Sequence, residues 1–343
     1  MFVVGAGRSG TSMLRAVLDG HSQLAVAHEA GFVYPLSRRR ARYERNTGFD
    51  VDAFRQDLVA QRAVRCNLGF GPDELHAALG GSEISGYADA VRRVFAHYAA
   101  TLGKPRYGDK MPAYVQHIAP LAALFPEARF VHIVRDGRDV ALSNMALDGG
   151  PRDPVALALD WRQRVQAGRA AGARLGPRRY HEIRYEDLVA DPVVPITELC
   201  AFLDLDFEQP MLSLTERTDR VLERVRANPR HARLAEPVSS GARSWRTHMT
   251  HRDLARFETV AGDLLERLGY ERGAPAPALT DRSAALWGRV RWSVRRAGAR
   301  LPGLLRRTWR ATGGTLGRGH TPPPDAARLR PGDDEDPDQR PDG

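Results

Sequence analysis

The chain has 343 residues, of which 42% are hydrophobic and 27% are charged. These fractions are close to the averages of soluble globular proteins, and they exclude collagen-like, wholly disordered and multi-span membrane proteins. The formal net charge of +9 is unevenly distributed, because residues 282–318 carry ten arginines and no acidic residue. The rest of the chain is therefore nearly neutral.

Short β-rich runs alternate with longer helical patterns along the first 270 residues. The runs predict strands at 2–5, 24–27, 106–108, 130–134 and 181–184, and the patterns predict helices at 11–18, 155–171, 195–203 and 250–268. The run at 130–134 is apolar almost throughout, as expected where both faces of a parallel sheet are covered. The alternation predicts an α/β fold: a P-loop-like domain of three layers, with a central parallel sheet and helices on both faces.

Composition divides the chain into four regions. We expect one globular domain over 1–272, a linker over 273–283, a basic amphipathic helical extension over 284–312, and a disordered tail over 313–343 that is rich in proline, glycine and acidic residues. The two cysteines are too few for a disulfide framework and fit a reducing compartment. Since the sequence opens on an apolar strand with no room for a secretion signal, we expect a cytoplasmic protein.

The turn between the first strand and the first helix is rich in glycine and hydroxyl groups. Residues 5–12 read G-A-G-R-S-G-T-S. A strand-loop-helix turn of this kind directs backbone N–H groups and the helix dipole at an anion. The string fits the G-x-G-x-x-G dinucleotide fingerprint, with Glu29 near the place of a ribose-binding acid, and it also fits a P-loop that lacks its lysine. The side chains crowded into this loop favour the second pattern, and a small anion held without a metal. The alternative is an ordinary glycine-rich turn with no ligand.

A second basic element follows the strand at 130–134. Arg135 comes at the end of this strand, and Ser143 lies on the helix expected after it. An arginine and a serine placed in this way can hold a second phosphate. Two anion sites at neighbouring strand ends imply a ligand with two phosphate-type groups. The alternative is a solvated turn with a local ion pair.

These motifs resemble those of sulfotransferases that use 3′-phosphoadenosine-5′-phosphosulfate (PAPS). The likeness is greatest to tyrosylprotein sulfotransferases and covers residues 1 to about 270. It is carried by R-S-G-T-S-M-L-R-A-V-L-D-G-H, H-E-A, Y-G-D-K-M-P, L-F-P-E-A-R-F, V-R-D-G-R-D and I-R-Y-E-D-L-V, which occur in the same order. The resemblance implies a transferase that moves a sulfuryl group from PAPS to a hydroxyl acceptor without a metal.

The resemblance also implies a role for each matched residue. It assigns the 3′-phosphate to Arg135 and Ser143, a further cofactor contact to Tyr185, and the 5′-phosphosulfate to Arg8, Ser9, Gly10, Thr11 and Ser12. Glu29 matches the proposed catalytic base, and Lys110 matches a lysine near the transferred group. The family's last cofactor loop has a lysine before a tryptophan, where this chain has Arg243 before Ser244 and Trp245.

In-line sulfuryl transfer needs a base for the acceptor and cations where the leaving oxygen gains charge. Glu29 meets the first need and Arg8 with Lys110 meets the second. The chain has only two lysines, so a lysine kept at 110 indicates a compact ammonium at that place. His28 is an alternative base. The structural alternatives are that Lys110 is a surface charge and that Glu29 is a helix-capping or solvated acid.

The segment 284–312 combines eight arginines with three of the five tryptophans. A basic helix with an apolar side can lie on an anionic membrane surface, and a packed or partner-bound extension is the equal alternative. Nucleic acid is not an expected partner, because no recognition module accompanies the charge. The sequence leaves the acceptor and the oligomeric state open. Rival functions are a nicotinamide-dependent oxidoreductase and an inactive membrane-associated adaptor.

Overall fold

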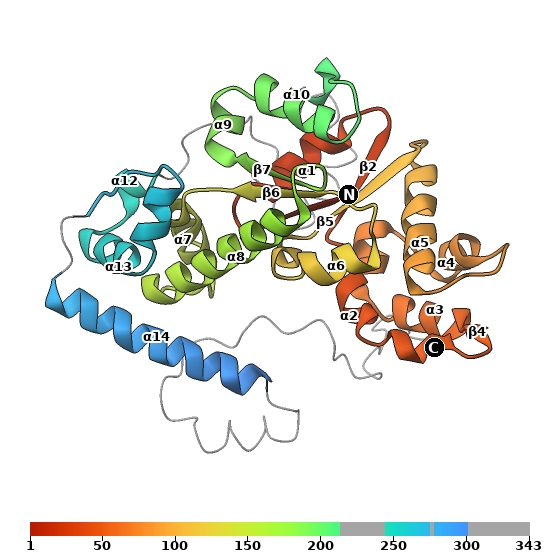
Figure 1. Ribbon diagram of the computed structural model, residues 1–343, viewed down its shortest axis with the longest axis horizontal. Coiled ribbons are helices and arrows are strands. Elements are labelled where there is room, and N and C mark those ends of the chain that lie inside the picture. Colours follow the sequence, from red (N-terminus) through yellow and green to blue (C-terminus); the bar gives the residue numbers. More distant parts are fainter. Residues whose placement is uncertain (213–243, 275–277, 301–343) are drawn as a thin grey trace, which may run out of the picture.

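The computed structural model describes residues 1–212, 244–274 and 278–300 (Figure 1). Its centre is a sheet of five parallel strands in the order β2-β5-β1-β6-β7. The strands are β1 (Phe2–Gly5), β2 (Leu24–His28), β5 (Arg106–Lys110), β6 (Phe130–Val134) and β7 (Tyr180–Arg184). Each corresponds to a predicted strand within two residues. A separate two-stranded hairpin pairs β3 (Glu44–Arg45) with β4 (Gly48–Phe49).

Helices cover both faces of this sheet, which confirms the predicted three-layer α/β fold. On one face lie α1 (Thr11–Asp19), α9 (Tyr185–Ala190) and α10 (Val193–Phe202), and on the other lie α5 (Tyr87–Thr101), α6 (Ile118–Leu124) and α8 (Pro154–Leu175) (Figure 1). Alternate residues of β1 enter the two cores: Val3 packs with the first group, and Phe2 and Val4 pack with the second. Strand alternation produces this division.

The remaining helices surround this centre. They are α2 (Val33–Ser37), α3 (Val51–Val59), α4 (Pro72–Leu79), α7 (Gly137–Met145), α12 (Trp245–His248), α13 (His251–Arg267) and α14 (Leu279–Arg300). Local sequence fixes several starts: the Asp153 carboxylate accepts from the first amides of α8, and the Thr250 hydroxyl accepts from the amide of Asp253 in α13. A third core joins α7, α8 and α13 beyond the end of β6.

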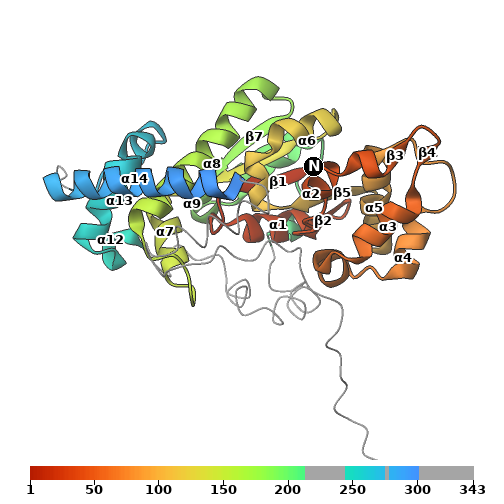
Figure 2. The same cartoon turned by 90° about the horizontal axis from the view of Figure 1, so that it is seen from below.

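The C-terminal helix α14 begins at Leu279, inside the stretch expected to be a linker, and its first turn includes Asp281. An acidic residue is favourable in a first turn because it faces the positive end of the helix dipole. Figure 2 shows α14 in blue, running alongside α13 and α8. The predicted tail 313–343 and the second half of the predicted extension lie outside the described residues. Within the described ranges, no helix is both long and apolar enough to cross a membrane.

Candidate active site

The loop between β1 and α1 has a strained backbone that only certain residues allow. Gly10, which precedes α1, has a φ of 89°, and a Cβ atom there would lie 2.4 Å from the ring of Tyr185. A side chain at position 10 would therefore meet both backbone strain and a steric clash. Arg8 also adopts a left-handed conformation, with a φ of 71°. Such strain in a non-glycine residue is concentrated at functional sites.

Donor groups gather at this loop. Ser9 is fully buried, yet its hydroxyl has no hydrogen-bond partner in the described part of the chain. Thr11 and Ser12 begin α1, whose first turn contains no acidic residue. A Cβ atom at Gly7 would meet nothing within 4 Å, so there is open space beside the loop. The buried hydroxyl and the open helix N-terminus fit a group with several anionic oxygens.

The two predicted anion-binding elements are in direct contact. The Nε atom of Arg8 donates to the Ser143 hydroxyl at 2.9 Å, and Arg135 donates to the carbonyl of Arg8 at 3.3 Å. The Arg135 guanidinium also lies 4.3 Å from the centre of the Tyr185 ring. This proximity follows from the sheet, because β1 and β6 are neighbours with Gly5 opposite Ile133. The structure therefore brings Arg8, Arg135, Ser143 and Tyr185 together.

On the opposite side of the loop, Lys110 and Glu29 form an ion pair. The Nζ atom of Lys110 lies 2.6 Å from Glu29 Oε1 and donates to the Ser12 hydroxyl at 3.2 Å. The Lys110 side chain is completely buried, and this burial lowers its pKa, while the Glu29 carboxylate opposes the shift. The loop lacks the lysine of a standard P-loop, and β5 supplies an ammonium group to it instead.

The backbone around Glu29 is held by residues that sequence reasoning missed. Glu29 has a φ of 49°; its N–H donates to the Lys110 carbonyl at 2.9 Å, and its own carbonyl accepts from Asn67 Nδ2 at 3.0 Å. The next amide, of Ala30, donates to Asp109 at 3.1 Å. Asp109 is buried, which raises its pKa to about 7. Asp109 lies within Y-G-D-K-M-P, but Asn67 belongs to no motif and stands on a π-helical turn, Val64–Leu68.

The expected alternative base, His28, is the last residue of β2 and lies opposite Lys110 in the strand register. The Glu29 carboxylate accepts from the Lys110 amine at 2.6 Å. The geometry therefore places the carboxylate beside the lysine and the loop.

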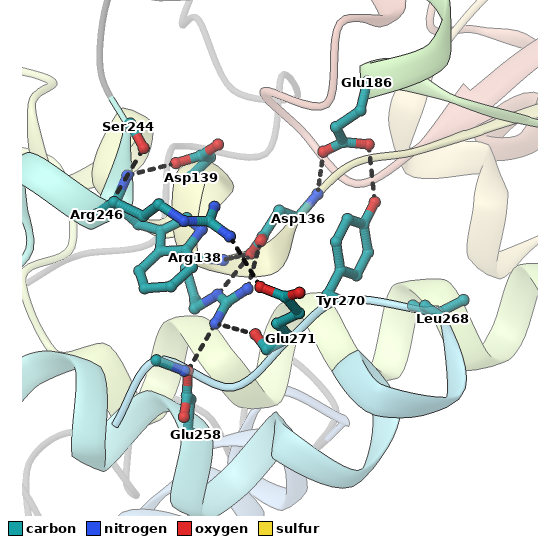
Figure 3. Close-up of polar contacts among 12 residues, drawn as sticks. Asp136, Arg138, Asp139, Glu186, Ser244, Arg246, Glu258, Leu268, Tyr270 and Glu271 are labelled. Atoms are coloured by element: carbon teal, nitrogen blue, oxygen red, sulfur yellow. Dashed lines mark hydrogen bonds and ion pairs between the residues drawn. The ribbon is translucent and has the colours of Figure 1, made fainter. Parts of the chain in front are cut away.

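Arg138, in the first turn of α7, connects the turn after β6 to the C-terminal helices (Figure 3). The turn contains the local ion pair that the sequence suggested, but the pair is buried instead of solvated. Arg138 is 1% exposed and contacts the Asp136 carboxylate at 2.6 and 3.0 Å and the Glu258 carboxylate at 2.6 Å. Its guanidinium lies 3.6 Å from the centre of the Trp245 ring.

Trp245 is anchored a second time, because its backbone N–H donates to the Asp139 carboxylate at 2.7 Å. Asp139 is on α7, the helix that also carries Ser143. The residue pair at the end of the last expected cofactor loop, Ser244 and Trp245, therefore lies against the second anion-binding element. Arg243 itself lies outside the described residues.

Comparison with known proteins identifies the family. The sequence profile described as "Sulfotransferase family" matches residues 1–209. Omega-hydroxy-beta-dihydromenaquinone-9 sulfotransferase Stf3 of Mycobacterium tuberculosis is 29% identical over 185 residues, which cover 49% of this chain and 42% of Stf3. Protein-tyrosine sulfotransferase A of Caenorhabditis elegans is 21% identical over 283 residues, which cover 81% of this chain and 68% of that protein. The chain thus spans less than half the length of the mycobacterial relative.

A solved structure shows the same fold. The sulfotransferase domain from the curacin biosynthetic pathway superposes with a TM-score of 0.53 at 20% identity, over 80% of this chain and 98% of that domain. The family profile covers more than half of the chain, and its relatives include protein-tyrosine sulfotransferases, as the sequence motifs predicted. This chain belongs to the sulfotransferase family.

Proposed function

We propose that the protein is a PAPS-dependent sulfotransferase that transfers the sulfuryl group to a hydroxyl acceptor. The observation that carries this proposal is the position of the β1–α1 loop, which lies between two clusters of polar side chains with different proposed roles. Arg135, Ser143 and Tyr185 lie on its nucleotide side, and the Glu29–Lys110 pair lies on its other side. A donor with two anionic groups on one ribose would span the first cluster and reach the second.

The residues present fit such a donor. The buried hydroxyl of Ser9, which has no partner among the described residues, and the first amides of α1 would hold the 5′-phosphosulfate, together with Thr11 and Ser12. Arg135 and Ser143 would hold the 3′-phosphate. Tyr185 presents its ring beside Gly10, where only a glycine leaves room for it. When bound, PAPS supplies the sulfuryl group and a phosphate as leaving group.

Glu29 is the proposed general base. Its carboxylate would take the proton from the acceptor hydroxyl as the new oxygen–sulfur bond forms. The Lys110 ammonium bridges Glu29 and the Ser12 hydroxyl at the start of α1, so it would stabilise the negative charge that develops on the leaving phosphate oxygen. Arg8 would add a second positive charge there. The backbone contacts of Glu29 keep its carboxylate directed at this place without reorganisation.

The proposed acceptor chemistry is a hydroxyl group. The relatives named above include a sulfotransferase of an omega-hydroxylated menaquinone and a protein-tyrosine sulfotransferase, and both of these substrates carry a hydroxyl. The acceptor side of the site would be built by α2 to α5, because these helices lie on the Glu29 side of the sheet. None of the quoted motifs falls within residues 32–100.

Glu29→Gln tests the base, with Glu127→Gln as control because Glu127 pairs with Arg92 at the surface. We expect Glu29→Gln to lower turnover by about a hundredfold or more while 3′,5′-ADP binds as before. Comparable loss of binding and turnover would reject the base role. Thermal unfolding of Glu29→Gln detects any cost of leaving Lys110 without its anion.

Ligand-induced stabilisation tests the function itself. Among 3′,5′-ADP, NAD and ATP, only 3′,5′-ADP should raise the unfolding temperature of the wild-type protein. Stabilisation by NAD would instead support an oxidoreductase, and a response to none of the three would support an inactive adaptor. Either result would overturn the proposed function.

A further inference from the structure

Helix α14 is attached to the body by one face. Ala285 is buried, and Gly288 lies so close to Val155 of α8 that a Cβ atom there would be 2.2 Å away. Near the start of the helix, Asp281 approaches Arg256 of α13 at 3.6 Å. These positions recur at intervals of three and four residues, so they form one face of the helix. The inner face of α14 is thus already packed.

The outward face carries a second apolar stripe. Its members are separated by seven, four and four residues along one side of the helix, with a tryptophan beside them. They are exposed by 80, 63, 68, 47 and 47%, in the order Leu279, Leu286, Trp287, Val290 and Val294. Five of the eight large hydrophobic side chains found exposed in the described residues therefore lie on this one helix. We call these five residues the outer stripe.

Exposed arginines border the outer stripe on both sides. Arg282 and Arg289 lie four and three residues from Leu286 on one border, and Arg291 lies four residues from Trp287 on the other. No acidic residue occurs from 282 to 318. The outward face of α14 is therefore apolar along its centre and positive along its edges. Figures 1 and 2 both place α14 at the periphery of the described elements.

We propose that the outer stripe and its arginines dock the protein on a membrane surface that contains anionic lipids. A helix lying in the interfacial plane buries an apolar stripe at the boundary of headgroups and acyl chains, while arginines on its flanks contact lipid phosphates. Trp287 suits this boundary because an indole has an apolar body and a polar N–H group. Inner-face packing fixes the orientation of the helix, so docking requires no unfolding of the body.

The charge pattern separates this surface from other partners. Two copies of the outer stripe facing each other would bring arginine borders together without acidic partners, which disfavours self-association. A nucleic acid would use the arginines but leave the apolar centre of the face in water. An anionic bilayer satisfies both features at once.

The experiment measures co-sedimentation of the full chain with vesicles of phosphatidylcholine alone or mixed with phosphatidylglycerol. One variant combines Leu286→Ser with Trp287→Ser, and another combines Arg282→Gln, Arg289→Gln and Arg291→Gln. The control variant combines Val193→Ser with Val194→Ser, which changes two exposed valines on α10. All these side chains lie outside the proposed active site, so turnover on a water-soluble acceptor should be unchanged and reports intact folding.

We expect the wild type and the control to bind the mixed vesicles at least tenfold better than either α14 variant. Salt should weaken the binding, and tryptophan emission should shift to shorter wavelength on vesicles. Equal binding by all variants, or no binding by the wild type, would overturn the proposal. Concentration-dependent dimerisation lost in Leu286→Ser with Trp287→Ser would show that a second copy covers the stripe instead, and would also overturn it.

Discussion

Replacing Arg138 with methionine should destabilise the protein strongly. Arg138 is 1% exposed, and its two carboxylate partners, Asp136 and Glu258, have side chains exposed by only 7% and 3%. Methionine fills a similar volume but removes the positive charge, so two buried carboxylates would lose their cationic partner and keep only backbone N–H donors. Trp245 would also lose the guanidinium that lies against its ring.

The magnitude follows from burial. Removing one member of a buried ion pair costs about 3–5 kcal/mol, because the charge left behind is desolvated and uncompensated. Arg92 provides the matched control: it meets both oxygens of Glu127 at 2.8 and 3.1 Å, but the two side chains are 36% and 58% exposed. Exposed pairs contribute about 0–1 kcal/mol, so Arg92→Met should be nearly neutral.

Urea unfolding followed by circular dichroism measures both variants. We expect Arg138→Met to lower the free energy of unfolding by at least about 2 kcal/mol more than Arg92→Met does. Because Trp245 adjoins the last expected cofactor loop, 3′,5′-ADP should also bind Arg138→Met more weakly at a temperature where both are folded. A cost no larger than that of Arg92→Met would refute the reasoning from burial.

Three further changes have sharp expected outcomes. Gly10→Ala should lower the free energy of unfolding by about 1–3 kcal/mol, because of its positive φ and a ring at 2.4 Å, whereas Gly7→Ala, with open space, should be nearly neutral in the same urea titration. Asn67→Ala should slow turnover about tenfold by releasing the Glu29 carbonyl, with 3′,5′-ADP affinity unchanged in calorimetry; equal loss of both would contradict this. Burial lowers the pKa of His132 to about 3, so the folded state resists protonation and stability falls as pH drops below about 6.5. Between about pH 7 and pH 5, the wild type should lose about 2 kcal/mol more than His132→Gln, and parallel pH curves would exclude this cause.

Strands β1, β2 and β6 were predictable because a strand covered on both faces of a parallel sheet leaves a short apolar run. Residues 130–134 show this most clearly, since all five are buried and the observed strand has the predicted bounds. The strand order was not predictable in this way. Lys110 reaches Glu29, 81 positions earlier in the chain, only because β5 lies between β2 and β1. No local pattern records that arrangement.

The sequence motifs indicated only those site residues whose own side chains would bind the ligand and which lie within a motif. Arg8 and Ser143 were expected near one ligand, and the structure adds that they touch each other. No sequence pattern identifies Asn67 as part of the site, because its side chain binds a backbone carbonyl that any residue at position 29 would present. From the sequence, Arg138 is expected in a turn at the surface. In the structure it is buried, because α13 places Glu258, 120 positions later, against it.

The position of β1 at the middle of the sheet has a consequence for how such an enzyme can diverge. The β1–α1 loop is flanked on one side by β6 and β7 and on the other by β5 and β2. Substitutions that reshape the flank of β2 and β5 need not disturb the residues that β6 and β7 contribute. Chimeras that exchange residues 32–100 between relatives should therefore retain the residues on the flank of β6 and β7 while acquiring a new acceptor preference.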